Sequence, residues 1–429
     1  MSTATPADPQ DARAYLRVVL LAAAIGIPAA LVAAGFFALV HYLEHWLWDD
    51  LPDVLGYESP PWFLVLGLPV VGALIVVVAR LFLPGDGGHS PLEGLSAKPT
   101  PIAHGPGVAL AALGSLPFGA VLGPEAPVVA LGSVVGSMAA RFGTHPKTAA
   151  LLSSAGSFSA ISTLFGGPVV AGVLLVESAA GFGLGAGVFP VLVPGLVAAA
   201  VGFLVFTGFG DWGGLETPGL VVPDLPLYDG VDFGDLGVGL VVGVLAAFVA
   251  VSVGLLARRV DGVGGRLGMP LLLVGGGLAV GGLAVLADLF GADSQDVLFS
   301  GQASVPDVVA EDSTKVLVVL IIAKFLAYGV SLGCGFRGGY IFPAIFLGVA
   351  FASFTVAWFD VSPTLAISVG AAAGMAAQTR LLITPLIFAS LLVGSQGADT
   401  IPAAVLATTA AWLTVHALDR RLQPAAAQG

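Results

Sequence analysis

The chain has 429 residues, of which 57% are hydrophobic and only 10% are charged. A soluble globular domain carries about 25% charged residues, so this composition excludes an ordinary soluble protein. The net charge of −12 comes from 27 acidic and 15 basic residues, and it argues against a nucleic-acid partner, which would need a basic surface.

Long apolar runs recur along the chain, and each is long enough to cross the roughly 30 Å hydrocarbon layer of a membrane. They lie at about 15–40, 62–83, 185–207, 236–257, 268–290 and 315–333. Shorter apolar runs, interrupted by glycine and proline, lie at 106–122, 127–140, 168–176 and 343–358. Because the runs are continuous rather than alternating, they predict helices and not a β-barrel. We therefore predict an all-α integral membrane protein with tilted, closely packed and discontinuous helices.

Charge placement predicts the topology. The first apolar run is too long for the core of a signal peptide, so we expect it to remain a membrane helix. The acidic stretches 209–236 and 288–312 contain no Lys or Arg and are assigned to the outside. The protein is then a multi-pass protein of the cell membrane with both termini in the cytoplasm, 1–14 being an N-terminal segment and 424–429 a short tail. The basic clusters assigned to the cytoplasmic side are Arg13 and Arg17, Arg141 and Lys147, Arg258, Arg259 and Arg266, and Arg420 and Arg421.

Two pairs of segments repeat at nearly one offset. The segments "GPEAPVVALG" (123–132) and "GYIFPAIFLG" (339–348) share their glycine, proline and leucine positions 216 residues apart. In a second pair, Pro168 lies opposite Pro385. Repeats that meet at broken helices are typical of transporters whose substrate lies near the middle of the membrane. The repeat predicts a single transmembrane domain over 15–423, with halves at about 15–210 and 235–416.

The broken helices predict an anion site. In both repeats irregular backbone precedes a proline that suits the first turn of a helix. The free N–H groups of that turn, and the positive end of the helix dipole, then face the break and favour an anion. We expect Arg337 and Arg380 to be interfacial or helix-end charges rather than ligands. Because the Glu125 carboxylate and an anion would compete for one spot, protonation of Glu125 and anion entry would be linked.

As a set, these segments resemble the CLC family of chloride channels and chloride/proton exchangers, in its prokaryotic type without cytoplasmic regulatory domains. "VLGPEAPVVALGS", "GGYIFPAIFLG" and "PGDGGHSPLEG" are similar to the family's GREGP, GxFxP and GSGIP regions. "FGGPVVAGVLLVE" and "AQTRLLITPLIF" extend the resemblance over about 85 to 395. It implies the CLC-type fold of two inverted repeats and a homodimer in which each subunit has its own pore.

The resemblance makes Glu125 the external gate and proton acceptor, whose ionised carboxylate occupies the outer anion site. The alternative is that Glu125 only caps the N-terminus of a helix. Backbone amides at Tyr340 and Ile341 would hold the central anion. The anion-binding residues predicted on this side are Gly123, Ala126, Gly339, Tyr340 and Ile341.

The inner side departs from the family's pattern. Gly88 stands at the place of an inner serine, while Ser90 lies one position before the proline, so a hydroxyl ligand is either missing or supplied by Ser90. Both residues are predicted as anion-binding. No tyrosine follows Tyr340, and Gln423 stands near the place of the family's inner tyrosine.

The residues expected in the proton path also depart from the family's pattern. Glu177 matches a structural glutamate of the family, and Ser178 stands where many exchangers carry an inner proton acceptor. We include Glu177 in the proton pathway; the alternative is a helix-end carboxylate satisfied by neighbouring amides.

The histidines suggest one alternative of a different class. His41 and His45, with Glu44 between them, fit the HxxEH pattern of some zinc enzymes, which would make the chain a membrane zinc hydrolase. The neighbouring Trp46 and Trp48 are instead typical of an interfacial belt. His89 is either a pH sensor or a polar loop residue. No phosphate-binding or dinucleotide motif is present, and we expect no metal and no cofactor.

The sequence therefore predicts a transporter, not an enzyme, that exchanges chloride for protons and is gated by a protonatable glutamate. A passive chloride channel without proton coupling is one alternative, and an exporter of another anion such as fluoride or nitrate is a second. The expected partners are the anion, protons, membrane lipid and a second copy of the chain.

Overall fold

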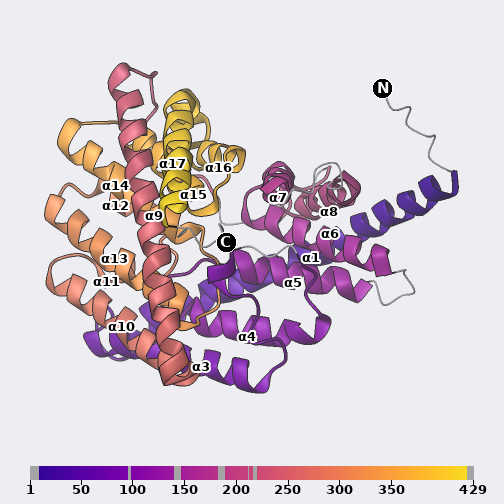
Figure 1. The fold of residues 1–429 in the computed structure, drawn as a ribbon, viewed down its shortest axis with the longest axis horizontal. Helices are drawn as coiled ribbons and strands as arrows, with labels where there is room; N and C mark the ends of the chain where they lie inside the picture. The colour runs from indigo at the N-terminus through magenta and orange to yellow at the C-terminus, as the bar shows by residue number, and fades with distance from the viewer. Residues whose placement is uncertain are drawn as a thin grey trace, which may run out of the picture. The chain divides into compact units, whose positions relative to one another are not determined.

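The computed structural model describes residues 9–94, 98–139, 146–181, 189–210, 212–215 and 220–422, and most of these residues are helical. Extended pairing within these ranges is limited to two isolated bridges. The short helices are α2 (Leu51–Val54), α11 (Ser294–Val297) and α12 (Val305–Ala310). The longer ones, labelled in Figure 1, are α1 (Pro9–His45), α3 (Trp62–Phe82), α4 (Gly105–Ser115), α5 (Glu125–Ala139), α6 (Pro146–Leu164), α7 (Pro168–Gly181), α8 (Phe189–Thr207), α9 (Phe233–Leu267), α10 (Met269–Leu289), α13 (Thr314–Cys334), α14 (Phe342–Phe359), α15 (Pro363–Thr379), α16 (Ile383–Val393) and α17 (Ile401–Leu422).

Within the described ranges, eight helical segments are long and apolar enough to cross a membrane. The prediction of an all-α membrane protein is therefore confirmed. The predicted runs 62–83 and 315–333 correspond to α3 and α13. The interrupted runs 127–140 and 343–358 are the shorter helices α5 and α14, which begin close to the predicted breaks.

Helix α9 is longer than the apolar run 236–257 predicts. It begins in a capping box, in which Asp232 accepts from the backbone of Asp235 and the Asp235 side chain accepts from the backbone of Asp232. At its other end the helix continues through polar residues and stops at Gly268, whose φ of 81° no longer fits a helix. Backbone capping therefore sets the ends of α9, and the apolar pattern covers only its middle.

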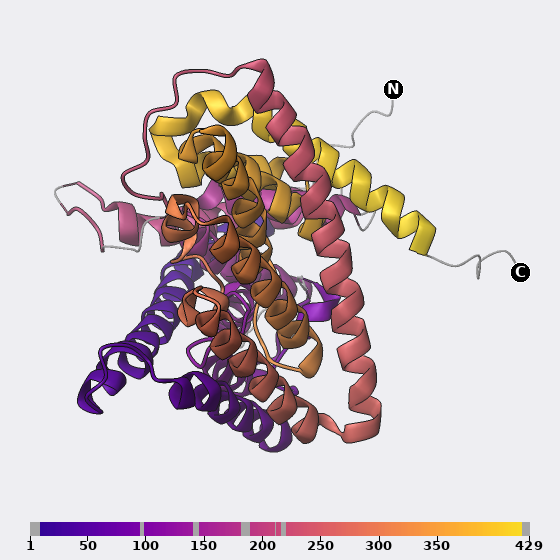
Figure 2. The same cartoon turned by 90° about the vertical axis from the view of Figure 1, so that its left-hand side faces the viewer.

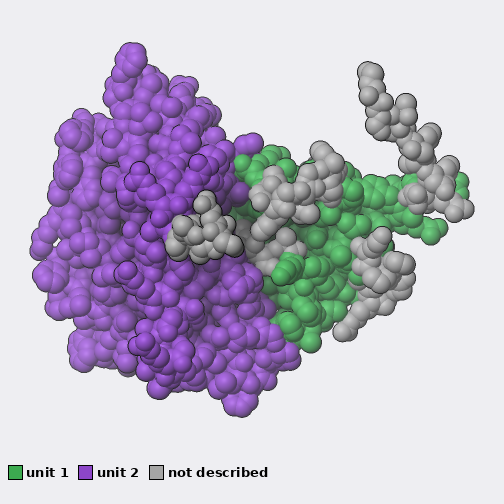
Figure 3. Space-filling view, in the orientation of Figure 1, with its two compact units in different colours: residues 1–36, 97–105, 128–218 green, residues 37–96, 106–127, 219–429 purple. Residues whose placement is uncertain are grey.

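The chain forms two compact units, which Figure 3 colours separately. Unit 1 comprises residues 1–36, 97–105 and 128–218, and unit 2 comprises 37–96, 106–127 and 219–429. The division passes through α1 and α5. The segments that the sequence assigns to the anion site, except the part of α5 beyond Pro127, belong to unit 2.

Unit 1 is held together by close approaches between helices at small residues. A Cβ atom added to Gly132 of α5 would lie 2.6 Å from the Cβ of Ala160 in α6. Buried hydroxyl groups add hydrogen bonds between the same two helices: Ser133 and Ser153 lie 2.7 Å apart, and Ser157 donates to the carbonyl of Val129 at 3.1 Å. Small residues at helix contacts let backbones approach closely inside a membrane, where lipid gives no hydrophobic driving force.

Close approaches at small residues also hold together the larger set of helices in unit 2. Helix α9 packs along α17, and α14 packs along α15; Figure 2 shows α9 running down the face of this unit. A Cβ added to Gly239 of α9 would lie 2.6 Å from the carbonyl oxygen of Ala403 in α17. Gly374 of α15 lies so close to α14 that an added Cβ would collide with the backbone of Ala344.

The acidic stretch that precedes α9 is tied to unit 2 through its backbone. Val222 donates its N–H to the carbonyl of Leu392 at 2.8 Å, and Tyr228 donates to that of Gln396 at 3.0 Å. The Tyr228 hydroxyl donates to the carboxylate of Asp235. Burial, and then this carboxylate, raise the pKa of Tyr228, so its hydroxyl stays protonated and keeps donating at neutral pH.

The close contact of α14 with α15 gives a stability prediction. Gly374→Ala should lower the free energy of unfolding by about 1–3 kcal/mol, because the new methyl group has no space beside Ala344. Gly275→Ala in α10 is the matched control, since a Cβ there meets no atom within 4 Å. The two purified variants are heated in detergent, and the monodisperse fraction is measured by size-exclusion chromatography. Equal losses for both variants would contradict the packing described for Gly374.

Candidate functional site

The two repeated segments meet at a pair of glycines. Gly123 donates its N–H to the carbonyl of Gly339 at 2.9 Å, and Gly339 donates to the carbonyl of Gly123 at 2.5 Å. These are the first residues of the two segments that the sequence aligns 216 positions apart. The pair brings the N-terminus of α5 to the N-terminus of α14, so the two predicted helix breaks face one place in unit 2.

Glu125, the first residue of α5, is buried in this place and is 1% exposed. Its Oε1 accepts the backbone N–H of Ile341 at 2.7 Å and that of Phe342 at 3.1 Å. These N–H groups are at the N-terminus of α14, where the helix dipole also favours a negative charge. Oε2 is buried and has no hydrogen-bond partner. A carboxylate is thus held by backbone amides, with one oxygen free.

The absence of side chains at the glycine pair leaves room for that carboxylate. A Cβ atom added to Gly123 or to Gly339 would collide with the carboxylate of Glu125. Each glycine uses its N–H on the other, and the N–H groups that reach Glu125 are those of Ile341 and Phe342. Ala126 follows Glu125 in the first turn of α5 and is half-buried. Phe342 donates to Glu125 although the sequence pointed only to Tyr340 and Ile341; its place directly before Pro343 could have indicated it.

Tyr340 is held at both its backbone and its side chain. Its carbonyl accepts the hydroxyl of Tyr328, a fully buried residue of α13, at 2.5 Å. Its own side chain extends towards the 88–94 loop, where a Cβ added to Gly94 would lie 3.5 Å from the Tyr340 hydroxyl. A tyrosine hydroxyl therefore reaches this loop from the centre of the site. Gln423, at the expected place of an inner tyrosine, lies outside the described residues.

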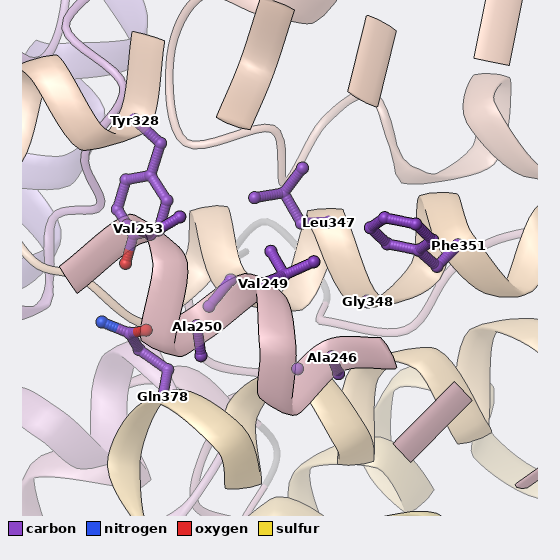
Figure 4. Close-up of a pocket in the computed structure, with 11 residues that line it drawn as sticks. Ala246, Val249, Ala250, Val253, Tyr328, Leu347, Gly348, Phe351 and Gln378 are labelled. Atoms are coloured by element: carbon purple, nitrogen blue, oxygen red, sulfur yellow. The ribbon is translucent and has the colours of Figure 1, made fainter. Parts of the chain in front are cut away.

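A small cavity lies beside Tyr328, between α9, α13, α14 and α15. Figure 4 shows the Tyr328 hydroxyl and the Gln378 carboxamide at one end of it and Phe351 at the other. Its free volume is about 10 Å³, which is space for about one water molecule. The Oε1 atom of Gln378 is buried without a hydrogen-bond partner, so it supplies a polar group that such a water needs.

The loop that carries Gly88 and Ser90 explains why a serine is absent at position 88. Gly88 has a φ of 99°, a conformation that residues with a side chain rarely adopt, and a Cβ there would lie 3.0 Å from Val108. Its N–H donates to the carbonyl of Gly85 at 2.9 Å. Ser90 precedes a short turn of 3₁₀-helix at Pro91–Glu93 and makes no capping hydrogen bond. Ser90 is therefore the hydroxyl that this loop can offer.

The comparisons with known proteins show the family of this chain. The family profile described as Voltage gated chloride channel matches residues 89–415. Over 358 residues the chain is 30% identical to YfeO of Salmonella newport (strain SL254), named as an ion-transport protein, with 79% of this chain and 80% of that protein covered. YfeO of Escherichia coli O7:K1 (strain IAI39 / ExPEC) is 32% identical over 356 residues, with 79% of each chain covered. This chain belongs to the CLC family.

Solved structures show the same CLC fold. A slow cyanobacterial Cl⁻/H⁺ antiporter superposes with a TM-score of 0.75 at 18% identity, over 94% of this chain and 95% of that one. A CLC-type fluoride/proton antiporter superposes with a TM-score of 0.69 at 19% identity, over 93% and 95%. The family and the fold are those of transmembrane ion transporters and channels, and the chain is a multi-pass membrane protein of this kind.

The two arginines near this CLC site differ. Arg380 ends α15 and donates to the carbonyls of Ala377 and Gln378, so the prediction of a helix-end charge is confirmed. Arg337 has a different environment. It is 5% exposed, lies in the loop between α13 and α14, and pairs with Asp86 at 2.6 Å. No feature near Arg337 in the sequence indicates that a carboxylate 251 positions earlier accompanies it.

A second buried cation, Lys324 of α13, was also missed. It is fully buried, and its Nζ donates to the carbonyls of Asp296 at 2.8 Å and Leu298 at 2.6 Å. The ammonium also lies 4.6 Å from the centre of the Phe346 ring in α14. A lone lysine inside an apolar run is expensive in a membrane and could have been recognised from the sequence.

The remaining candidates belong to elements other than α5 and α14. Glu177 and Ser178 are in α7 of unit 1, where the Ser178 hydroxyl donates to the carbonyl of Leu174 at 2.7 Å. His41 lies 3.8 Å from Glu44, and the described residues contain no group of three His, Cys, Asp or Glu side chains that could hold a metal. His89 lies 3.5 Å from Glu93 in the loop described above.

The support that Tyr328 gives to Tyr340 can be measured. Tyr328→Phe should lower the free energy of unfolding by about 1 kcal/mol, because the carbonyl of Tyr340 loses its donor while the packing of the ring is kept. Tyr57→Phe is the control, since Tyr57 is 45% exposed in a loop. Thermal unfolding of both variants is followed by differential scanning fluorimetry in detergent. A wild-type midpoint for Tyr328→Phe would show that the hydrogen bond does not hold the loop.

Proposed function

We propose that this chain exchanges a small anion, chloride in the first place, for protons across the cell membrane, with Glu125 as the gate. The observation that carries the proposal is the contact of the Glu125 carboxylate with the N–H groups of Ile341 and Phe342. Those amides, at a helix N-terminus, are what a small anion would bind. The carboxylate occupies the place that the substrate needs.

The exchange follows from this competition. When Glu125 is ionised, its charge holds the amides of α14 and keeps the anion out. When a proton neutralises it, for which the unpartnered Oε2 is available, the side chain is held less strongly. An anion can then take over the amides of Ile341 and Phe342. Because one place holds either the anion or the ionised carboxylate, anion and proton movement are coupled.

The other predicted residues take supporting roles in this proposal. The glycine pair at Gly123 and Gly339 keeps side chains away from the carboxylate, and Ala126 and Tyr340 complete the turns on either side. Gly88 and Ser90 would contact the anion on the inner side. Glu177 would take part in proton transfer. We further propose that the chain works as a homodimer in lipid with both termini in the cytoplasm.

Two alternatives follow from named residues. Ser178, at the place of an inner proton acceptor, favours a passive chloride channel without proton coupling. Gly88, at the place of a serine, favours an exporter of another anion such as fluoride or nitrate. A Cl⁻/H⁺ antiporter and a fluoride/proton antiporter are both among the structural neighbours, so the fold is compatible with either anion.

The gate is tested by Glu125→Gln in proteoliposomes. The wild-type protein should drive protons uphill when a chloride gradient is imposed. Glu125→Gln should abolish this proton movement and leave anion flux in place, because the amide cannot be protonated and carries no charge to compete. Glu58→Gln, in an exposed loop, is the control and should behave like the wild type. Coupled proton movement that survives Glu125→Gln would refute the gate, and a wild type without it would indicate a channel.

Anion choice is tested by competition. Chloride uptake into the same proteoliposomes is measured with fluoride or nitrate added outside at equal concentration. A chloride transporter should lose less than about half of its chloride flux, the loss expected for two anions of equal affinity. A much larger loss to one competitor would instead name that anion as the preferred substrate.

A further inference from the structure

The buried arginine of the loop between α13 and α14 is only partly satisfied. The Arg337 side chain is 6% exposed. Its Nε donates to the backbone carbonyl of Asp86 at 3.1 Å, and its Nη2 donates to that carbonyl at 2.9 Å and to the Asp86 carboxylate at 2.6 Å. Nη1 takes part in no hydrogen bond among the described residues. Nη1 is not among the fully buried unpartnered atoms of the described residues, so it reaches accessible space and keeps its two N–H donors for another acceptor.

The charge around this arginine is also unbalanced. The Asp86 carboxylate receives a second guanidinium, because Arg80 donates to its two oxygens at 2.8 and 2.9 Å. Arg80 uses its remaining nitrogen on the carbonyl of Gly335 at 3.1 Å. Two cations thus share one carboxylate, and the Asp86 side chain is 57% exposed, so water weakens its negative field. Glu93, the next acidic group, is 69% exposed and lies beside His89.

Arg337 belongs to one of the two loops in which the sequence predicts anion-binding residues, the loop before α14, and its side chain contacts the other, the loop at Gly88. A Cβ added to Gly87 would lie 3.4 Å from the Cγ of Arg337 and 3.2 Å from that of Arg80, so the backbone that leads into Gly88 lies on both side chains. The backbone N–H of Arg337 donates to the hydroxyl of Ser115, the last residue of α4, at 2.9 Å. It precedes Gly339 of the glycine pair by two positions. The Arg337 side chain therefore lies against the loop that leads into Gly88, and its backbone continues into the turn that carries the α14 amides.

We propose that Nη1 of Arg337 binds the transported anion at a second subsite, next to the backbone of Gly88. The ligand is a small monovalent inorganic anion, and the inference rests on the proposed transport function. A donated N–H from a charged group binds an anion more strongly than a neutral hydroxyl does. Asp86 holds the guanidinium in place through its other two nitrogens. The subsite thus needs no serine at position 88, where the backbone conformation disfavours a side chain.

The test is the chloride concentration that half-saturates flux of the purified full-length protein in proteoliposomes. Arg337→Gln should raise this concentration by at least about ten-fold, since a hydrogen bond from a charged donor is lost. Arg337→Lys keeps the charge and should recover part of the affinity. Arg80→Gln removes the second cation at Asp86 but no free donor, so it should raise the half-saturating concentration by less than Arg337→Gln does.

These results distinguish anion binding by Arg337 from a purely structural role of its pair with Asp86. Equal shifts for Arg337→Gln and Arg80→Gln, or no shift for Arg337→Gln, would overturn the proposal. If Arg337→Gln does not fold, the Arg337→Lys variant decides, because a wild-type half-saturation there would also overturn it. Chloride titrated into the detergent-solubilised protein, followed by calorimetry, tests binding without transport. Weaker binding in the Arg337 variants would support the subsite even if wild-type flux shows no proton coupling.

Discussion

The structure depends on the burial of one carboxylate. A charge in a membrane interior is stable only where donors surround it, and Glu125 finds its donors on the backbone of another helix. This requirement dictates the glycines at 123 and 339, because any side chain there would occupy the space of the carboxylate. It also dictates the support behind the donors, where Tyr328 fixes the carbonyl of Tyr340. One buried group thus constrains residues from three separate stretches of the chain.

The buried cations also need neighbouring hydrogen-bond partners, which for them are acceptors rather than donors. Lys324 is stabilised by two backbone carbonyls and an aromatic ring, and Arg337 by a carbonyl and a carboxylate. Both lie within a few residues of α14 or contact it, and the N–H groups of that helix face Glu125. Within unit 2, therefore, positive side chains and helix amides lie along the same segment. Two of the 15 basic residues of the chain thus lie beside the helix whose amides hold Glu125.

The fold and the meeting of the two repeated segments could be predicted from the sequence, because apolar runs and repeated motifs are visible in it. Apolar runs fix the helices, and the 216-residue offset already paired Gly123 with Gly339. The inner side could not be predicted, because it depends on contacts between distant segments. Nothing near Arg337 in the sequence points to Asp86, and the left-handed turn at Gly88 is not apparent from a glycine alone. Lys324 stands alone in an apolar run, so it could have been recognised from the sequence as a buried cation, but it was missed.

The single cysteine of the chain has a practical consequence. Cys334 ends α13 with its thiol buried, and a Cβ added to Gly276 of α10 would lie 2.5 Å from its sulfur. Water-soluble thiol reagents therefore have no native target in the folded chain. A cysteine placed in any accessible loop becomes the only group that such a reagent labels. The side of the membrane on which each loop lies can thus be mapped one residue at a time in the otherwise native protein.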